Sequence, residues 1–424
     1  MTPQPSQPYD VTVIGLGYIG LPTATFFAAS GLRVYGYDIN SSLADSVQRG
    51  EAPFVEPGFE SLLASAVGAG NLKTGTIIEP AKSYIVAVPT PLQPDQKPDV
   101  SFVFTAAATL APLLKGGDLV VLESTCPPGL TEDITNHILK SRPDLTLTPN
   151  QLNSLYVAHA PERVLPGKIM SEMTTNDRIV GGVTTESAER TKRLYKNFCT
   201  GEVLITDSRT AEMAKLAENS FRDVNIAFAN ELSLICDDLN IDVWELISLA
   251  NRHPRVNILQ PGPGVGGHCI AVDPWFIVDA ATDSARLIKT SREVNDSKPQ
   301  RVLDKISKKV SVVQSNSDKL DICILGITFK PDIDDIRESP ALYIAETVAR
   351  TYTEANISIV EPNLESLPEP FSEFPNVTQT TLHKGLTGAD IAVVLVDHSL
   401  FKQELHLLAQ HKCVIDTRGI LNNE

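Results

Sequence analysis

Val11-Thr-Val-Ile-Gly-Leu-Gly-Tyr-Ile-Gly20 is the stretch that decides the fold of this chain. Its first four residues are apolar or β-branched and predict a buried strand, and the residues after the stretch have the pattern of a helix. The turn between strand and helix carries three glycines, Gly15, Gly17 and Gly20. A second strand is expected at Leu32–Tyr37. A strand, a glycine-rich turn, a helix and a strand in this order are typical of an α/β fold of the Rossmann type.

The glycine spacing also predicts a dinucleotide site. The first glycine of such a motif permits a tight turn, the second lets backbone approach a pyrophosphate, and the third packs helix on strand. Asp38 closes the second predicted strand, where a carboxylate accepts both ribose hydroxyls and repels a 2′-phosphate. NAD is therefore favoured over NADP. Tyr18 and Ile19, inside the motif, are predicted to be further cofactor contacts.

Composition fits a large enzyme outside the membrane. The 424 residues allow two or three domains, and no apolar run approaches the ~18 residues that cross a bilayer. A net charge of −16 argues against nucleic-acid binding, because a phosphate backbone would be repelled. Without a signal sequence or paired cysteine spacing, we expect a cytoplasmic protein that has no disulfide and no bound metal. The first ten residues are expected to form a disordered tail.

Short apolar runs that alternate with helical stretches predict a parallel sheet. Further strands are expected at Tyr84–Val88, Leu119–Leu122, Tyr156–His159 and Arg178–Val180. Proline-containing turns follow two of these strands, where open α/β sheets place their ligand-binding loops. Thr90 and Thr125 lie in these turns and are predicted to contact the cofactor.

A long helix is predicted from Thr210 to about Asn240, because this stretch has no proline or glycine and repeats apolar residues at helical spacing. It is expected to join two domains. A contact between subunits and an ordinary position in the core would each explain its length. Lys215 and Asn219 stand at i and i+4 and so share a face of this helix.

A second α/β unit follows the long helix. Its strands are expected at Asp321–Gly326, Ile357–Val360, Ile391–Val396 and Val414–Asp416. A helix is expected from about Pro340 to Arg350. Because this unit has no GxGxxG turn, we expect it to hold a nucleotide-derived substrate and not a second dinucleotide.

Gly262-Pro-Gly-Val-Gly-Gly-His-Cys269 places one thiol in a glycine-rich loop, with Asp273 four residues later. Isolated cysteines are more often inert than nucleophilic. The glycines, however, would let a substrate approach the sulfur closely, which favours Cys269 as a nucleophile. His268 is given no catalytic role, because adjacent residues in an extended segment point in opposite directions.

An ordered set of motifs gives the whole chain a family resemblance. The motifs are Gly15-Leu-Gly-Tyr-Ile-Gly20, Val88-Pro-Thr-Pro91, Glu123-Ser-Thr125, Ala160-Pro-Glu-Arg163, Lys215-Leu-Ala-Glu-Asn219, the Cys269 loop, and Phe329-Lys330 with Arg337-Glu-Ser339. In this order they resemble the nucleotide-sugar 6-dehydrogenases, relatives of UDP-glucose dehydrogenase. The resemblance implies two Rossmann-like domains joined by a long central helix. The implied parts are an NAD-binding domain at 1–205, a helical dimerisation region with the Cys269 loop at 206–305, and a UDP-sugar-binding domain at 306–424.

The resemblance also implies an activity, the NAD-dependent oxidation of a sugar C6 alcohol to a carboxylate for surface polysaccharide. Cys269 would add to the intermediate aldehyde, because a thiohemiacetal can lose a second hydride and become a thioester. Asp273 would orient or deprotonate water. Lys215 and Asn219 would stabilise alkoxide and oxyanion character at the C6 oxygen.

Glu162 resembles an acidic residue of the family near the reacting carbon. It is a candidate base or water positioner, and a loop salt bridge with Arg163 is the alternative. The residues implied at the substrate are Glu162, Arg163, Lys215, Asn219, Arg255, Gly266, Lys330 and Arg418. Arg337 is assigned to NAD, and a homodimer is expected through the central helix.

Ala271-Val272 stands where UDP-glucose enzymes carry a Pro-Lys pair, which points away from UDP-glucose. The runs 251–258 and 260–275 are similar to family members that act on UDP-N-acetyl-D-mannosamine, and UDP-N-acetyl-D-glucosamine is the alternative substrate. Two other classes compete. A two-electron hydroxyacid-type dehydrogenase would need no thiol, and a non-catalytic regulator would have lost Cys269, Lys215 or Asp273.

Overall fold

The computed structural model describes residues 9–165, 167–267, 269–314 and 320–422. His268 and most of the expected N-terminal tail lie outside these ranges. The chain divides into two compact units, Met1–Ala217 with Trp275–Ala280, and Glu218–Pro274 with Ala281–Glu424. Each unit has its own sheet and its own hydrophobic core.

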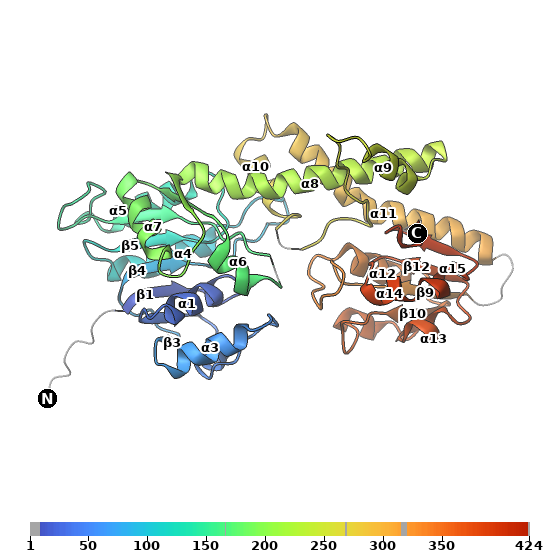
Figure 1. Ribbon diagram of the computed structural model, residues 1–424, viewed down its shortest axis with the longest axis horizontal. Coiled ribbons are helices and arrows are strands. Elements are labelled where there is room, and N and C mark those ends of the chain that lie inside the picture. Colours follow the sequence, from blue (N-terminus) through green and yellow to red (C-terminus); the bar gives the residue numbers. More distant parts are fainter. Residues whose placement is uncertain (1–8, 166, 268, 315–319, 423–424) are drawn as a thin grey trace. The chain divides into compact units, whose positions relative to one another are not determined.

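The first unit is built on an eight-stranded sheet in the order β3-β2-β1-β4-β5-β6-β7-β8 (Figure 1). Its strands are β1 (Tyr9–Ile14), β2 (Val34–Tyr37), β3 (Leu72–Gly75), β4 (Ala81–Val86), β5 (Leu119–Leu122), β6 (Tyr156–His159), β7 (Arg178–Gly182) and β8 (Val203–Asp207). The first six follow the Rossmann order. All neighbours pair in parallel except β6 and β7, which are antiparallel. That one reversal was not predicted.

Both faces of this sheet are buried, as alternation along β5 shows. Leu119 and Val121 join the core formed with α1 and α7, whereas Val120 and Leu122 join the core formed with α4 and α5. Successive strand residues point to opposite faces, so an unbroken apolar strand requires helices on both sides. The helices of this unit are α1 (Gly20–Ala29), α2 (Ser41–Gln48), α3 (Phe59–Gly68), α4 (Ser101–Leu110), η1 (Ala111–Leu113), α5 (Leu130–Ser141), α6 (Ile169–Thr175) and α7 (Thr185–Tyr195).

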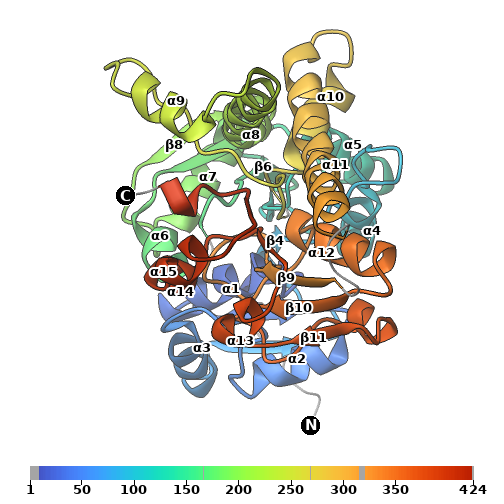
Figure 2. The same ribbon diagram turned by 90° about the vertical axis from the view of Figure 1, so that its right-hand side faces the viewer.

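The second unit has a five-stranded, all-parallel sheet in the order β11-β10-β9-β12-β13. Its strands are β9 (Asp321–Leu325), β10 (Asn356–Val360), β11 (Val377–Gln379), β12 (Ile391–Val394) and β13 (Val414–Asp416). In Figure 2, β9, β10 and β11 lie side by side with α12 and α13 next to them. The helices are α9 (Val243–Ala250), α11 (Arg286–Gln314), α12 (Pro340–Thr351), η2 (Glu369–Glu373), α13 (Leu382–Leu386), α14 (Ser399–Gln403), α15 (Leu405–Ala409) and η3 (Ile420–Asn422).

Two helices belong in part to both units. Helix α8 (Ser208–Leu239) is unbroken over its length, with residues up to Ala217 in the first unit and the rest in the second (Figure 1). Asp207 caps its start by accepting hydrogen bonds from the backbone and side chain of Thr210, and Asn240, with φ +53°, follows its end. Helix α10 (Asp273–Ala280) also begins in one unit and continues in the other.

The predicted α/β class, with two Rossmann-type sheets and a long central helix, is confirmed. Three strands were not predicted, namely β3, β8 and β11. These strands have few fully buried residues, so their apolar patterns are weak. Within the described ranges, no helix is both long enough and apolar enough to span a membrane.

Candidate active site

The three glycines of the glycine-rich turn differ in the space that a side chain would have at each position. Gly15 has φ +96°, and a Cβ there would lie 2.5 Å from the carbonyl oxygen of Ala87. A Cβ on Gly20 would collide with the carbonyl oxygen of Gly15. No described atom lies within 4 Å of a Cβ built on Gly17, which is exposed. The turn thus leaves open backbone at the second glycine, where the predicted role needs it.

Asp38 holds this turn from the end of β2. Its Oδ2 accepts a hydrogen bond from the Leu16 backbone N–H at 2.8 Å, and its Oδ1 accepts one from Asn40 N–H at 2.9 Å. Tyr18 donates to Glu56 at 3.4 Å, and its ring lies 4.7 Å from that of Phe54. Hydrogen bonds from Leu16 in the glycine-rich turn and from Asn40 therefore orient the Asp38 carboxylate.

Glu56 links the glycine turn to a segment far along the chain. Besides Tyr18, it accepts hydrogen bonds from the backbone N–H groups of Gly167 at 2.8 Å and Ile169 at 2.9 Å. Ile19 lies directly before α1, and Thr90, half-buried, follows β4. The predicted cofactor residues of this unit therefore lie after the carboxyl ends of β1, β2, β4 and β5.

Lys215 on α8 donates a hydrogen bond to the Thr125 hydroxyl, which follows β5. The lysine side chain is buried, and its positive charge affects the pKa of the nearby His159. Burial, together with the Lys215 ammonium, lowers the pKa of His159 to about 3, so that this histidine is neutral. Neither ring nitrogen of His159 has a hydrogen-bond partner among the described residues.

Glu162 is a buried partner of Arg178. The guanidinium donates to Glu162 Oε2 at 2.6 Å, and both side chains are about 5% exposed or less. Glu162 Oε1 accepts the backbone N–H of Arg163 at 2.7 Å, while the Arg163 guanidinium donates to the carbonyl of Asp177. Burial opposes the charge on Arg178, but the Glu162 carboxylate outweighs it and raises the pKa of Arg178. The ion pair anticipated for Glu162 is thus found with Arg178, which sequence reasoning treated only as a strand residue.

Glu123, two residues before Thr125, is a second buried carboxyl in this region. It accepts hydrogen bonds from Tyr195 at 2.5 Å and from Thr23 at 2.9 Å. Burial and, secondarily, the Glu162 charge raise the pKa of Glu123 to about 7. The first unit therefore contains a buried carboxyl with a pKa raised to about 7 close to the buried ion pair of Glu162 and Arg178.

In the second unit, the glycines of the Cys269 loop face protein. A Cβ on Gly264 would lie 2.8 Å from Pro340, and one on Gly267 would lie 3.0 Å from the ring of Phe329. A Cβ on Gly266 would collide with the carbonyl oxygen of Glu338. The expected reason for these glycines was access for a substrate, but close packing of the loop on residues 329–340 requires them as well.

Cys269 is exposed, whereas four of the other cysteines are buried and Cys413 is half-buried. Asp273, at the start of α10, is only 2% exposed, and its backbone N–H donates to the Cys269 carbonyl at 2.8 Å. Asn219 Nδ2 donates to Asp273 Oδ2 at 2.6 Å. Three of the predicted catalytic residues therefore lie close together within this unit.

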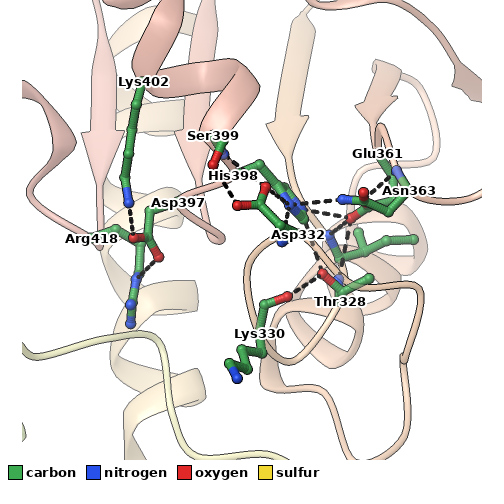
Figure 3. A network of polar contacts seen from close by, with 11 residues as sticks. Thr328, Lys330, Asp332, Glu361, Asn363, Asp397, His398, Ser399, Lys402 and Arg418 are labelled. Carbon is green, nitrogen blue, oxygen red and sulfur yellow. Dashed lines mark hydrogen bonds and ion pairs between the residues drawn. The ribbon is translucent and has the colours of Figure 1, made fainter. Parts of the chain in front are cut away.

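The predicted basic residues of the second unit differ in their surroundings. Arg418 donates to Asp397 at 2.8 Å (Figure 3). Its guanidinium also lies against Gly262. Arg337 forms a two-pronged ion pair with Asp335, and Arg255 is exposed in the loop after α9. The side chain of Lys330 extends away from the polar network in Figure 3. Arg418 therefore contacts the Cys269 loop directly, at Gly262.

Three successive stretches of the chain match the domains of one family. Residues 9–199 match the NAD binding domain, 209–297 the central domain and 323–423 the UDP binding domain of the UDP-glucose/GDP-mannose dehydrogenase family. The chain belongs to this family. It is therefore an NAD-dependent oxidoreductase, and the open backbone at Gly17 and the carboxylate of Asp38 fit the NAD that the family binds.

Relatives within the family span nearly the whole chain. The UDP-N-acetyl-D-mannosamine dehydrogenase of Escherichia coli (strain K12) is 51% identical over 417 residues, which cover 97% of this chain and 98% of the relative. The NDP-N-acetyl-D-galactosaminuronic acid dehydrogenase of Ralstonia nicotianae is 50% identical over 412 residues, 97% of this chain and 96% of the relative. The solved structure of the UDP-N-acetyl-mannosamine dehydrogenase from S. aureus has a TM-score of 0.82 at 41% identity and covers 97% of this chain and 95% of that one.

Some buried polar residues of the first unit were not found from sequence. Arg178, Tyr195 and Glu56 each join segments that are distant in the chain, and no local motif marks them. A charged residue that opens an otherwise apolar strand, as Arg178 opens β7, is the one available signal. Among the described residues, no group of three or more His, Cys, Asp or Glu side chains could hold a metal ion.

Proposed function

We propose that this protein oxidises UDP-N-acetyl-D-mannosamine at C6 to UDP-N-acetyl-D-mannosaminuronate in the cytoplasm, for a surface polysaccharide. The observation that carries the proposal is the 51% identity to the E. coli enzyme named for this substrate, over nearly both whole chains. Ala271-Val272 between Cys269 and Asp273 supports a substrate other than UDP-glucose.

The mechanism follows from what two oxidations at one carbon require. NAD supplies the hydride acceptor for both steps. After the first hydride has left C6, the Cys269 sulfur adds to the aldehyde carbon and gives a thiohemiacetal. Loss of the second hydride leaves a thioester, and water then attacks the carbonyl carbon and releases the acid and the thiol.

The chain's own groups have distinct tasks in this scheme. Asn219 fixes the Asp273 carboxylate by donating to its Oδ2 at 2.6 Å, and this carboxylate orients the water that attacks the thioester. Lys215 stabilises negative charge on the C6 oxygen, and its hydrogen bond to Thr125 sets the direction of the ammonium. Glu162 is held by Arg178 and acts as a base or water positioner for hydrolysis of the thioester.

The basic residues bind the nucleotide. Lys330, Arg255 and Arg418 meet the UDP part of the substrate, because cations suit diphosphate oxygens. Arg163 and Gly266 line the sugar, and Arg337 meets NAD once it exchanges Asp335 for the cofactor. This assignment corresponds to three parts of the chain, 1–205 for NAD, 206–305 for the Cys269 loop and subunit contact, and 306–424 for the UDP-sugar.

The first test is the amount of NADH formed per UDP-N-acetyl-D-mannosamine consumed by the purified protein. Two NADH per sugar are expected, because both oxidations occur before release. One NADH per sugar would contradict the covalent scheme, and no turnover of this sugar beside good turnover of another would contradict the substrate.

A second candidate substrate is the N-acetyl-D-galactosamine nucleotide, since the R. nicotianae relative is 50% identical over a similar length. UDP-N-acetyl-D-galactosamine and UDP-N-acetyl-D-glucosamine should therefore be run beside the mannosamine substrate. A kcat/KM at least tenfold higher for the mannosamine sugar is expected, and the opposite ranking would transfer the proposal to the preferred sugar.

The role of Cys269 is tested by replacement with serine. Cys269→Ser is expected to lower acid formation by at least 10³-fold, because a serine hydroxyl stays protonated and is a poorer nucleophile than a thiolate, and an ester is less reactive towards water than a thioester. Cys413→Ser is the matched control, since Cys413 is half-buried in the same unit. Normal acid formation by Cys269→Ser would rule out the thioester.

We also propose a homodimer formed through α8. Its second half exposes Phe221, Phe228 and Ile235, which are 72%, 52% and 46% exposed and stand seven residues apart. Side chains at this spacing lie along one side of a helix. Phe221, Phe228 and Ile235 thus form an apolar stripe on α8. A second copy of the chain presents the same stripe and can cover it in a two-fold symmetric contact.

A further inference from the structure

The segment from the end of β9 to the first residue of α12, residues 326–340, supports the Cys269 loop within the second unit. Three loop glycines pack on it, with Gly264 against Pro340, Gly266 against Glu338 and Gly267 against Phe329. A glycine at each position is what allows backbone to approach this closely. A displacement of the segment must therefore displace the loop that ends in Cys269.

Phe329 occupies the decisive position in this contact. Its ring lies under Gly267, two residues before Cys269, with three ring atoms 3.0–3.3 Å from a Cβ built on the glycine. Its backbone N–H donates to the Asp335 carbonyl at 3.1 Å, which closes residues 329–335 into a compact loop. The next residue is Lys330, whose side chain extends away from the network while its carbonyl accepts the Thr328 hydroxyl at 3.0 Å (Figure 3).

A buried histidine and carboxylate hold the other side of the same segment. His398 and Glu361 are both at most 3% exposed, and Nε2 lies 3.2 Å from Glu361 Oε2. Nδ1 accepts the backbone N–H of Asp332 at 3.0 Å, so the ring proton must be on Nε2, directed at Glu361 (Figure 3). Glu361 Oε2 also accepts Ile327 N–H at 2.8 Å.

The charge on Glu361 is stabilised by these contacts. Burial alone would raise its pKa, but the hydrogen bonds from His398 and from the Ile327 backbone lower it. The Asp332 carboxylate in turn accepts the Ser399 backbone N–H at 2.9 Å and the Ser399 hydroxyl. The segment is therefore fixed at residues 327 and 332, on both sides of Phe329 and Lys330.

We propose that Phe329 is a positioning residue that transmits nucleotide binding at Lys330 to the thiol of Cys269, and that His398 with Glu361 holds the segment that makes this possible. The inference rests on the proposed function in one respect, namely that Lys330 meets the substrate diphosphate. Binding at Lys330 restrains Phe329, and Phe329 restrains Gly267 and the loop, so the thiol is ordered for reaction only when a nucleotide is present.

The rate at which iodoacetamide alkylates Cys269 measures this coupling. The full chain would carry Cys413→Ser, so that the only cysteine not buried among the described residues is Cys269. UDP serves as the probe, because it lacks the sugar that would cover the sulfur. In this background, saturating UDP is expected to slow alkylation at least threefold.

Phe329→Leu tests the link itself. It is expected to raise the alkylation rate at least threefold without ligand and to abolish the effect of UDP, while the Kd for UDP changes less than threefold. Phe374→Leu is the matched control, since Phe374 is a partly buried aromatic of the same unit that packs against Arg350. The control should keep the ligand-free rate and the UDP effect.

Turnover gives a second readout. Phe329→Leu should lower kcat with little change in KM, whereas Lys330→Ala should raise KM for the nucleotide-sugar. An unchanged ligand-free alkylation rate in Phe329→Leu, or a full UDP effect in that variant, would overturn the proposal. Absence of UDP binding to the parent protein by calorimetry would instead contradict the proposed function, and the ligand-free comparison of Phe329→Leu with its parent would still decide the positioning role.

The histidine is tested by two replacements of different chemistry. His398→Asn keeps an acceptor near the Nδ1 position and should keep the alkylation rate within about twofold of the parent. His398→Leu has neither acceptor nor donor and should behave as Phe329→Leu does. Equal rates in the Asn and Leu variants would contradict the role of His398, and if His398→Leu does not fold, the Phe329→Leu comparison decides alone.

Discussion

At the scale of single residues, Glu123 shows how burial changes a carboxyl group. Its two hydrogen-bond donors, Tyr195 and Thr23, do not compensate for the loss of water and the nearby Glu162 charge, so its pKa is raised to about 7. In the unfolded chain the group ionises near its usual value of about 4.5. The folded protein thus binds the proton more tightly between these two pH values.

The raised pKa predicts a loss of stability as pH increases. The contribution of the protonated Glu123 carboxyl to the free energy of unfolding is fully present below about pH 4.5. This contribution, at most about 3 kcal/mol, is lost as the pH rises through 7. Glu123→Gln, which keeps the shape and stays neutral, should match the wild type in unfolding temperature at pH 5 and exceed it by several degrees at pH 8. Calorimetric melting at both pH values measures this, with the exposed Glu132→Gln as control. An equal difference at both pH values would contradict it.

The glycines of the NAD turn give a prediction that separates binding from folding. Gly17→Ala adds a Cβ that no described atom approaches within 4 Å, so the unfolding temperature should stay within about 1 °C while the Kd for NAD rises at least tenfold. Gly20→Ala puts its Cβ against the Gly15 carbonyl and should lower the unfolding temperature. Melting curves and NAD titrations of both variants test this, and normal NAD affinity in Gly17→Ala would contradict it.

At the scale of elements, α8 and α11 are joined by buried polar groups. Arg292 donates to Asp223 at 2.6 Å, Asn295 also donates to Asp223, and Asn230 bridges Asn295 and the backbone N–H of Gly262. The network thus reaches the first residue of the Cys269 loop. Partners that lie 65–72 residues apart in sequence cannot be paired from one sequence, although the two helices themselves can be predicted from their periodicity.

Lys298 on α11 provides the test of this helix contact. Burial, and next the charge of Lys305, lowers its pKa to about 8, so below pH 8 the folded protein carries an unfavourable buried charge. Stability should therefore rise as pH increases from 8 towards 10.5. Lys298→Met should raise the free energy of unfolding at pH 7 by about 1–2 kcal/mol, after allowing for the lost hydrogen bond to Ser233.

Lys305→Met is the control for Lys298→Met. Lys305 is 46% exposed and paired with Asp237, so its replacement should change stability by less than about 1 kcal/mol. Denaturant unfolding at pH 7 and pH 10 compares the two variants. A destabilised Lys298→Met at pH 7 would show that the hydrogen bond to Ser233 outweighs the buried charge.

At the scale of the whole molecule, the sequence predicts those strands and helices whose own residues form a strong apolar pattern. The strands β5, β6 and β13 were predicted to the residue and α8 within two residues of each end, because apolar runs and helical spacing are strong there. The weak edge strands and the antiparallel direction of β7 were missed, since direction depends on the crossover and not on the strand's own residues. In the same way, helix spacing predicts that Lys215 and Asn219 share a helix face, and the family resemblance assigns them to the site. Their hydrogen bonds to Thr125 and Asp273 could be identified only from the coordinates.

The proposed homodimer is the last prediction at this scale. A chain of 46.0 kDa that pairs through the stripe of Phe221, Phe228 and Ile235 should sediment as a dimer, because the stripe is self-complementary about a two-fold axis. Phe228→Glu places two charges in the centre of that contact and should shift the protein to monomer at micromolar concentration. Leu152→Glu is the control, because Leu152 is fully exposed in the first unit, outside the stripe, and its replacement should leave the dimer unchanged. A monomeric wild type, or a dimeric Phe228→Glu variant, would exclude α8 as the subunit contact.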